Sequence, residues 1–477
     1  MITVHRFRQG ERYFAVDGGS ASVHELDDIA YDVLGVWLEL EGIGANGQEN
    51  SLGRGEPKPR GNSISLGDVL DGCQGLFAKY GEEEVKDAAS DLMGLVEAGL
   101  LFHDDAYVQD WAQDGGVGYS LKALCLNVSH DCNLRCRYCF AGTGNFGGDR
   151  LNMPASVAQG AIDFLLANSE GRERVEVDFF GGEPLLNLPV VKTTVEYATS
   201  RAESMGKEIR FTLTTNGMLL DEETADYLDR TMFNIVLSLD GRRVVNDRLR
   251  IAPRGVKVYD TVLPRLKHMA KLRQERQYYV RGTYTAYNKD FFEDVRHLVE
   301  VGFDRVSVEP VVANPREPYA LKLEDLEELF HQYDRLADYY VKMQQAGAGF
   351  EFYHFNLSLL EGQCLSKRLT GCGAGSEYLA ITPNGDIYPC HQFVGQAEYL
   401  MGNIRDGQLS EGLREIFQTS HVLSKDECRK CWARFFCSGG CHANAVSVNN
   451  DIKQPDGLSC ALLKKRLECS IYIQGCL

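Results

Sequence analysis

The segment Cys132-Asn133-Leu134-Arg135-Cys136-Arg137-Tyr138-Cys139-Phe140 follows directly after an apolar run over residues 121–128, which predicts a buried β-strand. Its three cysteines have CxxxCxxC spacing, so their thiolates can bind three irons of a [4Fe–4S] cluster and leave the fourth iron without a protein ligand. A zinc site would need a fourth ligand nearby, and His130 is the one local candidate. The segment therefore predicts an open iron–sulfur cluster at the end of a strand.

Strand-like and helix-like stretches alternate around this segment. Helices with apolar residues at 3–4 spacing are expected between the strands, for example over residues 156–167 and 321–343. The predicted strands cover residues 121–128, 175–180, 209–214, 233–239, 279–285 and 305–309. Six βα units indicate an α/β fold whose parallel sheet is curled into a partial (β/α)6 TIM-like barrel, with reactive groups at the C-terminal strand ends.

Short polar motifs follow three of these strands: Gly181-Gly182-Glu183-Pro184, Thr215-Asn216-Gly217 and Ser238-Leu239-Asp240-Gly241. Together with the cysteine segment they resemble the radical S-adenosylmethionine (radical SAM) superfamily. The resemblance implies that the open iron binds S-adenosylmethionine, and that one electron cleaves it to a 5′-deoxyadenosyl radical that takes hydrogen from an unactivated carbon. The implied cofactor-binding residues are Tyr138, Gly181, Gly182, Glu183, Asn216, Ser238, Asp240 and Arg250.

A second group of cysteines lies beyond residue 347, where the alternation stops and Pro383-Asn384-Gly385 predicts a hairpin turn. Its spacing is Cys372-x12-Gly385-x4-Cys390, then Cys428-x2-Cys431-x5-Cys437-x3-Cys441, then Cys460. This pattern resembles the SPASM domain of peptide-modifying radical SAM enzymes. A pair of zinc sites is the alternative, because CxxC pairs alone suit zinc equally.

The SPASM resemblance implies two auxiliary [4Fe–4S] clusters, and hence three clusters in the chain. The ligands would interleave: Cys372, Cys390 and Cys441 for the first, and Cys428, Cys431, Cys437 and Cys460 for the fully ligated second. Seven ligands leave one position open, which either Cys364 or a substrate thiolate would fill. Of the other cysteines, Cys73 and Cys125 are expected to be buried, and Cys469 and Cys476 to be ordinary residues of the C-terminal tail.

The first 105 residues read as a compact winged-helix-like module. Strands are expected over residues 3–7, 13–16 and 22–26, helices over 29–41 and 83–98, a polar loop over 42–62 and a returning strand over 99–102. The predicted domains are residues 1–105 for this module, 106–120 for a linker, 121–346 for the radical SAM core and 347–477 for the SPASM domain.

Two longer sequence motifs indicate a narrower family within the radical SAM superfamily. Gly371-Cys372-Gly373-Ala374-Gly375 and Tyr388-Pro389-Cys390-His391-Gln392-Phe393-Val394-Gly395 are similar to the maturases of SCIFF (six-cysteines-in-forty-five) peptides and their ranthipeptide-forming relatives. Such enzymes form thioether bridges from a cysteine sulfur to a carbon of another residue in a ribosomally made precursor. The resemblance implies that residues 1–105 are a RiPP recognition element, which holds the leader peptide by strand addition. It also implies an electron donor such as flavodoxin or ferredoxin.

Two other classes share part of the pattern. A sulfatase-maturase-like dehydrogenase oxidises one side chain without forming a bridge, but its typical aspartate base has no clear counterpart in Ser307-Val308-Glu309-Pro310. A non-catalytic electron-transfer protein would not need an open iron with cofactor-binding turns beside it. No general base can be assigned, since His391 reads as a turn or core histidine.

Charge and composition exclude several partners. The 477 residues carry a formal net charge of −18 and no Lys/Arg-rich run, so neither nucleic acid nor an anionic membrane is an expected partner. The N-terminus lacks the apolar region of a secretory signal, and no stretch is long and uncharged enough to span a bilayer. The chain has fifteen cysteines, most of them grouped at metal-ligand spacings, which suits a reducing compartment, and a cytoplasmic location is expected.

Overall fold

A computed structural model describes residues 3–43, 64–103, 120–357 and 365–477. Its centre is a curved sheet of parallel strands in the order β12-β11-β10-β8-β7-β6-β4. The strands are β4 (Ala123–Ser129), β6 (Arg174–Gly181), β7 (Glu208–Thr215), β8 (Asn234–Ser238), β10 (Gln277–Tyr284), β11 (Arg305–Pro310) and β12 (Glu351–Phe352). The first six are the six predicted strands, each within two residues of its expected bounds, so the predicted partial barrel is confirmed.

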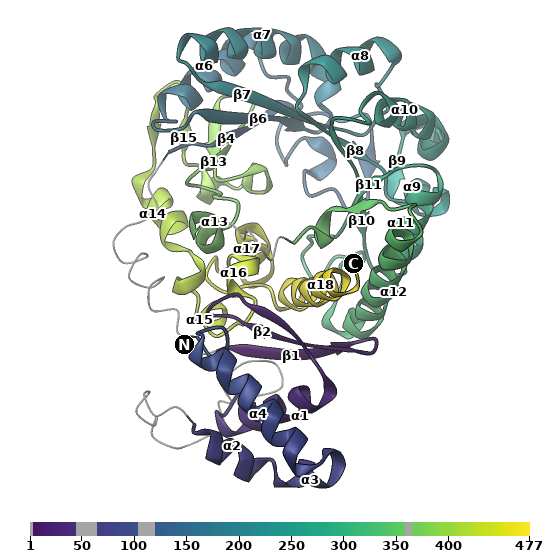
Figure 1. The fold of residues 1–477 in the computed structure, drawn as a ribbon. Helices are drawn as coiled ribbons and strands as arrows, with labels where there is room; N and C mark the ends of the chain where they lie inside the picture. The colour runs from purple at the N-terminus through teal and green to yellow at the C-terminus, as the bar shows by residue number, and fades with distance from the viewer. Residues whose placement is uncertain (1–2, 44–63, 104–119, 358–364) are drawn as a thin grey trace.

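Helices cover the outer side of this sheet (Figure 1). They are α6 (Ala155–Ala167), α7 (Leu188–Ser204), α8 (Glu222–Thr231), α9 (Arg243–Leu249), α10 (Val258–Leu272), α11 (Phe291–Glu300) and α12 (Leu326–Gln345). Every residue of β4 is buried, as expected for a parallel strand that is covered on both faces. Apolar side chains of the strands and helices form one continuous core, which fixes the positions of the strand ends where the polar motifs lie.

The C-terminal region extends the same sheet. Strand β13 (Tyr378–Ile381) pairs in parallel with β4, and β14 (Asp386–Tyr388), β15 (Gly402–Asn403) and β16 (Gln408–Leu409) continue it in antiparallel order. The predicted turn at Pro383-Asn384-Gly385 joins β13 to β14, and Gly385 takes the left-handed φ of +88° that such a turn needs. The second cysteine group is therefore built directly onto the first strand of the barrel.

Five short helices and one long helix carry most of the remaining C-terminal residues that the structure describes. They are α13 (Leu365–Thr370), α14 (Glu411–Thr419), α15 (Asp426–Arg429), α16 (Arg434–Cys437), α17 (His442–Asn449) and the long α18 (Gly457–Cys476). Helix α18, which the sequence did not predict, packs against α12 and against the first strand of the chain. Cys469 lies on α18 and is fully buried, as Cys73 and Cys125 also are, so these three cysteines take part in packing.

The N-terminal module is a three-stranded antiparallel sheet with helices on one side. It contains β1 (Val4–Gln9), β2 (Arg12–Asp17), β3 (Val23–Leu26), α1 (Asp28–Leu40), α2 (Leu66–Gly72), α3 (Gln74–Tyr80) and α4 (Glu82–Glu97). The returning strand predicted over residues 99–102 was wrong, because Gly99 (φ +69°) and Phe102 (φ +56°) adopt left-handed turns that bury Leu101 against the helices. The predicted polar loop and linker lie almost wholly outside the described residues.

The module is joined to the C-terminal region through β1. His5 Nε2 lies 2.8 Å from Glu468 Oε1 on α18, and its ring stacks on Trp432 at 4.3 Å between centroids. Arg434 Nη1 donates to Thr3 Oγ1 over 2.6 Å. Strand β3 lies at the opposite edge of the small sheet, where no further strand of the described residues pairs with it. No helix in the described part of the chain has the length and apolarity to cross a membrane.

Candidate active site

The CxxxCxxC segment leaves the C-terminal end of β4 and is tied to a second strand. Its short strand β5 (Arg135–Cys136) pairs antiparallel with β9 (Arg250–Ile251), which sets Cys136 opposite Arg250. The Leu134 amide donates to Cys132 Sγ over 3.4 Å, and the Cys139 amide donates to the Cys136 carbonyl over 3.2 Å. Burial raises the pKa of the Cys132 and Cys136 thiols to about 12, and the charge of Cys139 adds to both shifts. The three thiols therefore lie close together in a site that disfavours free thiolates and suits bound cations.

Glycines let the end of β6 approach this segment closely. A Cβ on Gly182 would lie 2.1 Å from the Asp131 carbonyl oxygen, and one on Gly181, whose φ is +128°, would lie 2.3 Å from that of Ser129. The Gly182 and Glu183 amides donate to these same two carbonyls, over 2.8 and 2.9 Å. The glycine pair of this motif is thus required by the backbone contact between β6 and the cysteine segment.

Glu183 connects the end of β7 to the cysteine segment through hydrogen bonds. Its buried carboxylate accepts from Thr215 Oγ1 and from the Asn216 amide, each over 2.8 Å. Asn216 in turn donates through Nδ2 to Asn133 Oδ1 over 2.8 Å, with Cys132 Sγ at 3.6 Å. Burial raises the pKa of Glu183 to about 7, against the opposing effect of these donors. The ends of β6 and β7 therefore hold the cysteine segment from one side.

Asp240, which follows β8, holds the cysteine segment from the other side. Its carboxylate is fully buried and accepts from Arg250 Nε and Nη2 over 3.0 and 2.9 Å, and from Tyr138 Oη over 2.8 Å. The Thr283 amide on β10 donates to the same carboxylate over 3.1 Å. Asp240 thus fixes Arg250 and Tyr138 beside the cysteines, whereas Ser238 at the end of β8 is half-buried.

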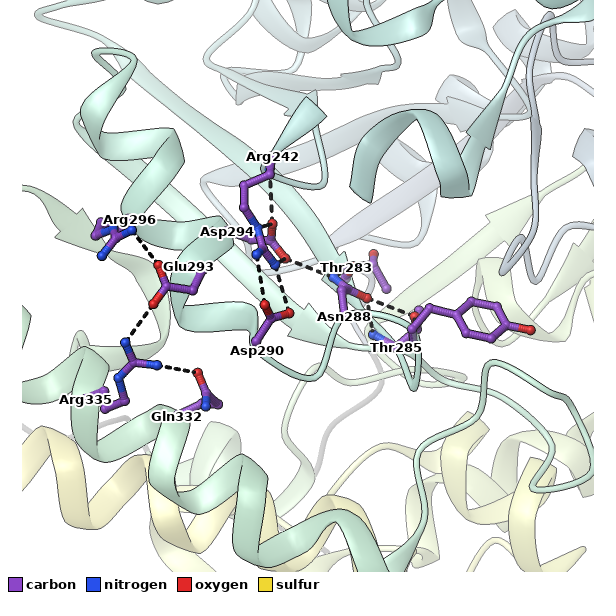
Figure 2. A network of polar contacts seen from close by, with 11 residues as sticks. Arg242, Thr283, Thr285, Asn288, Asp290, Glu293, Asp294, Arg296, Gln332 and Arg335 are labelled. Atoms are coloured by element: carbon purple, nitrogen blue, oxygen red, sulfur yellow. Dashed lines mark hydrogen bonds and ion pairs between the residues drawn. The ribbon is translucent and has the colours of Figure 1, made fainter. Parts of the chain in front are cut away.

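A network of ion pairs anchors this strand end to α11 (Figure 2). Arg242 donates to both oxygens of Asp290 over 2.8 Å and, through Nε, to Asp294 Oδ1 over 2.8 Å. Asp294 is fully buried, and a Cβ on Gly241 would lie 2.3 Å from the Asp294 Cβ. Gly241 has a φ of +115°, so glycine is required where the Asp240 loop turns onto α11.

The C-terminal cysteines form two groups in the structure. Burial raises the pKa of Cys390, and the charges of Cys441 and Cys372 raise it further, so these three thiols are neighbours. Burial raises the pKa of Cys460 to about 12, with added effects from the second group, Cys437, Cys428 and Cys431. Cys372 and Cys441 are exposed, whereas every member of the second group is buried or half-buried. Cys364 lies outside the described residues.

A cavity of about 300 Å³ joins these groups to the barrel. Its walls come from the end of β11, from the loop between α16 and α17, and from α18; they include Glu309, His354, Arg466, Cys437, Cys441 and Cys460. A groove of about 400 Å³ adjoins it, and the two share six lining residues: Pro310, Val312, Asn444, Asp456, Ser459 and Leu462. The cavity is lined by one cysteine of the first group, Cys441, and by two of the second, Cys437 and Cys460.

Comparison with known proteins identifies the two parts. The Radical SAM superfamily profile matches residues 126–301, and the profile of the SPASM iron–sulfur cluster-binding domain matches residues 372–432. The protein has a radical SAM fold with a C-terminal SPASM domain. Cys437, Cys441 and Cys460 lie beyond the matched SPASM residues, yet the structure places them with the cysteines that the profile covers.

Individual relatives agree with this fold. The cysteine-type anaerobic sulfatase-maturating enzyme of Clostridium novyi is 24% identical over 357 residues, which are 68% of this chain and 88% of that protein. The solved structure of anSMEcpe with bound AdoMet and Cp18Cys peptide has a TM-score of 0.62 at 21% identity and covers 75% of this chain and 98% of that one. Streptococcus suis SuiB bound to precursor peptide SuiA has a TM-score of 0.53 at 18% identity, covering 96% of this chain and 100% of that one.

Within the described ranges, no three His, Cys, Asp or Glu side chains converge around one ion position. A four-iron cluster does not require such convergence, because each thiolate binds a different iron. The three neighbouring thiols of the barrel segment and the two groups in the SPASM domain are consistent with the predicted [4Fe–4S] clusters.

Sequence reasoning missed the polar side chains at the mouth of the radical SAM barrel. Glu309 forms an ion pair with Arg281, and His354 lies 3.5 Å from Glu309 Oε1 and accepts at Nδ1 from Arg466 over 3.0 Å. Burial would raise the pKa of Glu309, but Arg281 and His354 lower it to about 2, so this carboxylate is a weak base. His391 packs between the rings of Phe140 and Phe180, and burial lowers its pKa to about 4, as a core histidine requires.

Proposed function

We propose that this radical SAM protein is a peptide maturase of the SCIFF/ranthipeptide kind, which joins a cysteine sulfur to a carbon of another residue in a ribosomally made precursor. The observation that carries the proposal is the cavity between Glu309 on the barrel and Cys441 in the SPASM domain. A peptide in this cavity could present its thiol to the first auxiliary site while a neighbouring residue faces the barrel. The proximity of the two reacting groups would provide the selectivity.

The barrel residues would generate and position the oxidant. Cys132, Cys136 and Cys139 would hold three irons of the first cluster. Glu183, Asn216, Asp240 and Arg250, which lie beside this segment, would be among the residues that bind the cofactor. When bound to such a reduced cluster, S-adenosylmethionine supplies a 5′-deoxyadenosyl radical that abstracts hydrogen from carbon. Asp240 would keep the Arg250 guanidinium beside the site, where its positive charge favours a carboxylate ligand.

The SPASM cysteines would hold the other two of three [4Fe–4S] clusters. Cys372, Cys390 and Cys441 supply three thiolates, so one position is left for Cys364 or for the sulfur of the peptide. The exposure of Cys372 and Cys441 favours access by a peptide, since solvent-accessible ligands imply an accessible metal. The peptide thiol would lose its proton on binding there, because a bound metal lowers the pKa of a thiol.

The N-terminal module would bind the leader of the precursor. The outer edge of β3, which pairs with no other strand among the described residues, offers backbone groups for strand addition. The Leu100 carbonyl, which follows α4, lies 3.0 Å from His24 Nε2 on that strand. Partly buried apolar side chains of α4, among them Leu95 and Val96, would take those of the leader. We further propose a cytoplasmic location and a flavodoxin or ferredoxin as the electron donor.

A sulfatase-maturase-like dehydrogenase is the second candidate, because the similar Clostridium novyi protein is named as a sulfatase-maturating enzyme. Glu309 lies at the end of the late strand β11, where such an enzyme would keep its base. The ion pair with Arg281 argues against this role, since the carboxylate is held ionised with a pKa of about 2. It would accept a proton poorly at neutral pH.

Mass spectrometry of a reacted precursor distinguishes the two functions. Anaerobically reconstituted protein, S-adenosylmethionine and a reductant are incubated with the cysteine-rich peptide encoded beside the gene, and free thiols are then alkylated. A thioether removes a hydrogen from sulfur and another from carbon, so the peptide should lose both and one alkylation site, with fragmentation suppressed between the bridged residues. An aldehyde on one residue with no bridge would establish the dehydrogenase instead.

A further inference from the structure

Lys425 is a buried lysine that lies between the two cysteine groups of the SPASM domain. Lys425 is only 1% exposed, although a lysine is almost never fully buried unless it is paired with an opposite charge. Its Nζ donates to the Gly439 carbonyl over 2.8 Å. Among the ion pairs of the described residues, none joins Lys425 to an aspartate or glutamate. A charge in this position requires negative groups close by.

The hydrogen bond from Lys425 to the Gly439 carbonyl shows which groups lie near its ammonium group. Gly439 lies in the loop Cys437-Ser438-Gly439-Gly440-Cys441, whose two cysteines belong to different groups. Ser438, Gly439 and Gly440 all have left-handed φ angles, of +62°, +86° and +73°, so the loop turns tightly around the lysine contact. The ammonium group is therefore held at the point where the chain passes from one cysteine group to the other.

As thiolate ligands of the proposed clusters, the cysteines would be the anions that act on this lysine. Burial lowers the pKa of Lys425, and the charges of four cysteines oppose that change: Cys428, Cys437, Cys441 and Cys460. Cys441 belongs to the first group and the other three to the second. The nearby histidines add no second positive charge, because burial and Lys425 both lower the pKa of His421 and of His442.

We propose that Lys425 is a positioning residue whose fixed positive charge lies between the two auxiliary clusters, favours their anionic reduced states and so raises both reduction potentials. The reduction potential of an iron–sulfur cluster depends on net charge, burial and nearby hydrogen-bond donors. A buried charge acts strongly because little solvent screens it. The inference rests on the proposed auxiliary clusters but not on thioether formation, since it concerns only the electron that each cluster takes up from an external reductant.

The test is a redox titration followed by electron paramagnetic resonance. The full-length chain with Cys132, Cys136 and Cys139 replaced by Ala gives spectra without the barrel cluster. In this background, Lys425→Gln removes the buried charge and Lys425→Arg keeps it. Lys430→Gln is the matched control, because it removes an exposed charge between Cys428 and Cys431.

Lys425→Gln should lower both auxiliary potentials, with at least about a tenfold loss in each one-electron reduction equilibrium, or about 59 mV. Lys425→Arg and Lys430→Gln should leave the potentials near those of the parent. If Lys425→Gln loses auxiliary iron while Lys425→Arg retains it, the charge is needed to hold the anionic clusters, which also supports the proposal.

Two results would overturn it: unchanged potentials with full iron in Lys425→Gln, or equal loss of iron in both Lys425 variants, which would indicate packing alone. A parent protein that holds no auxiliary iron would instead refute the proposed clusters, so the two failures are distinguishable.

Discussion

The buried ion pair between Asp240 and Arg250 should be essential to the barrel, and replacing Asp240 by Ala tests this. The change leaves Arg250, whose side chain is 10% exposed, without its bidentate partner, and also removes the acceptor of Tyr138. Breaking a buried pair from one side costs about 3–5 kcal/mol, because a charge stays buried without compensation. With a urea slope of about 3 kcal/mol per molar, the unfolding midpoint should fall by about 1–2 M.

Asp260→Ala is the matched control. Asp260 pairs with Arg243 over 2.6 Å, but these side chains are 47% and 63% exposed, and exposed pairs contribute about 0–1 kcal/mol. Its midpoint should fall by less than about 0.3 M. The double variant Asp240→Leu/Arg250→Met should recover part of the stability lost in Asp240→Ala, because no unpaired charge remains buried.

Anaerobic urea unfolding followed by circular dichroism measures all of these variants, and equilibrium dialysis with labelled S-adenosylmethionine measures binding. Asp240→Ala should also bind the cofactor more weakly, since Arg250 and Tyr138 are no longer held in place. Equal urea unfolding midpoints for Asp240→Ala and Asp260→Ala would refute the conclusion that Asp240 is essential to the stability of the barrel. A double variant less stable than Asp240→Ala would refute the buried-charge explanation.

Three further changes test other parts of the structure. Leu100→Asp changes a 40% exposed leucine beside β3 and should weaken precursor binding by about tenfold or more, whereas Leu40→Asp, at a 47% exposed leucine, should not. Equal calorimetric affinities would place the leader elsewhere. Cys364→Ala should keep the resting auxiliary spectrum and still respond to precursor; a changed resting spectrum would make Cys364 the fourth ligand. Gly241→Ala should lower the thermal midpoint more than Gly255→Ala, because both have a left-handed φ but only Gly241 is crowded; equal losses would contradict this.

The barrel could be predicted from the sequence because its signals are local. Each strand is a short apolar run followed by a helical pattern, and the cysteines are grouped at spacings typical of metal ligands. The polar motifs could be placed for the same reason, since each follows a strand directly. The prediction of a strand over residues 99–102 failed because tertiary packing of Leu101 outweighed local preference.

The features of the fold and the site that could not be predicted depend on contacts between residues that are distant in the sequence. Nothing local to β13 indicates that it pairs with β4, some 250 residues earlier, or that α18 covers the barrel and β1 together. The ion pair of Glu309 with Arg281 and the burial of Lys425 between two cysteine groups also arise only on folding. These residues have no distinguishing neighbours in the sequence, so only the structure connects them with the site.

The central claim is that Cys132, Cys136 and Cys139 hold a cluster that cleaves S-adenosylmethionine. The most direct measurement is the iron content and the rate of 5′-deoxyadenosine formation of anaerobically reconstituted protein, alongside the variant with all three cysteines replaced by Ala. Three clusters predict about twelve irons per chain, a loss of about four in the variant, and complete loss of 5′-deoxyadenosine formation. Stoichiometric zinc without iron, or unchanged cleavage in the variant, would contradict the account.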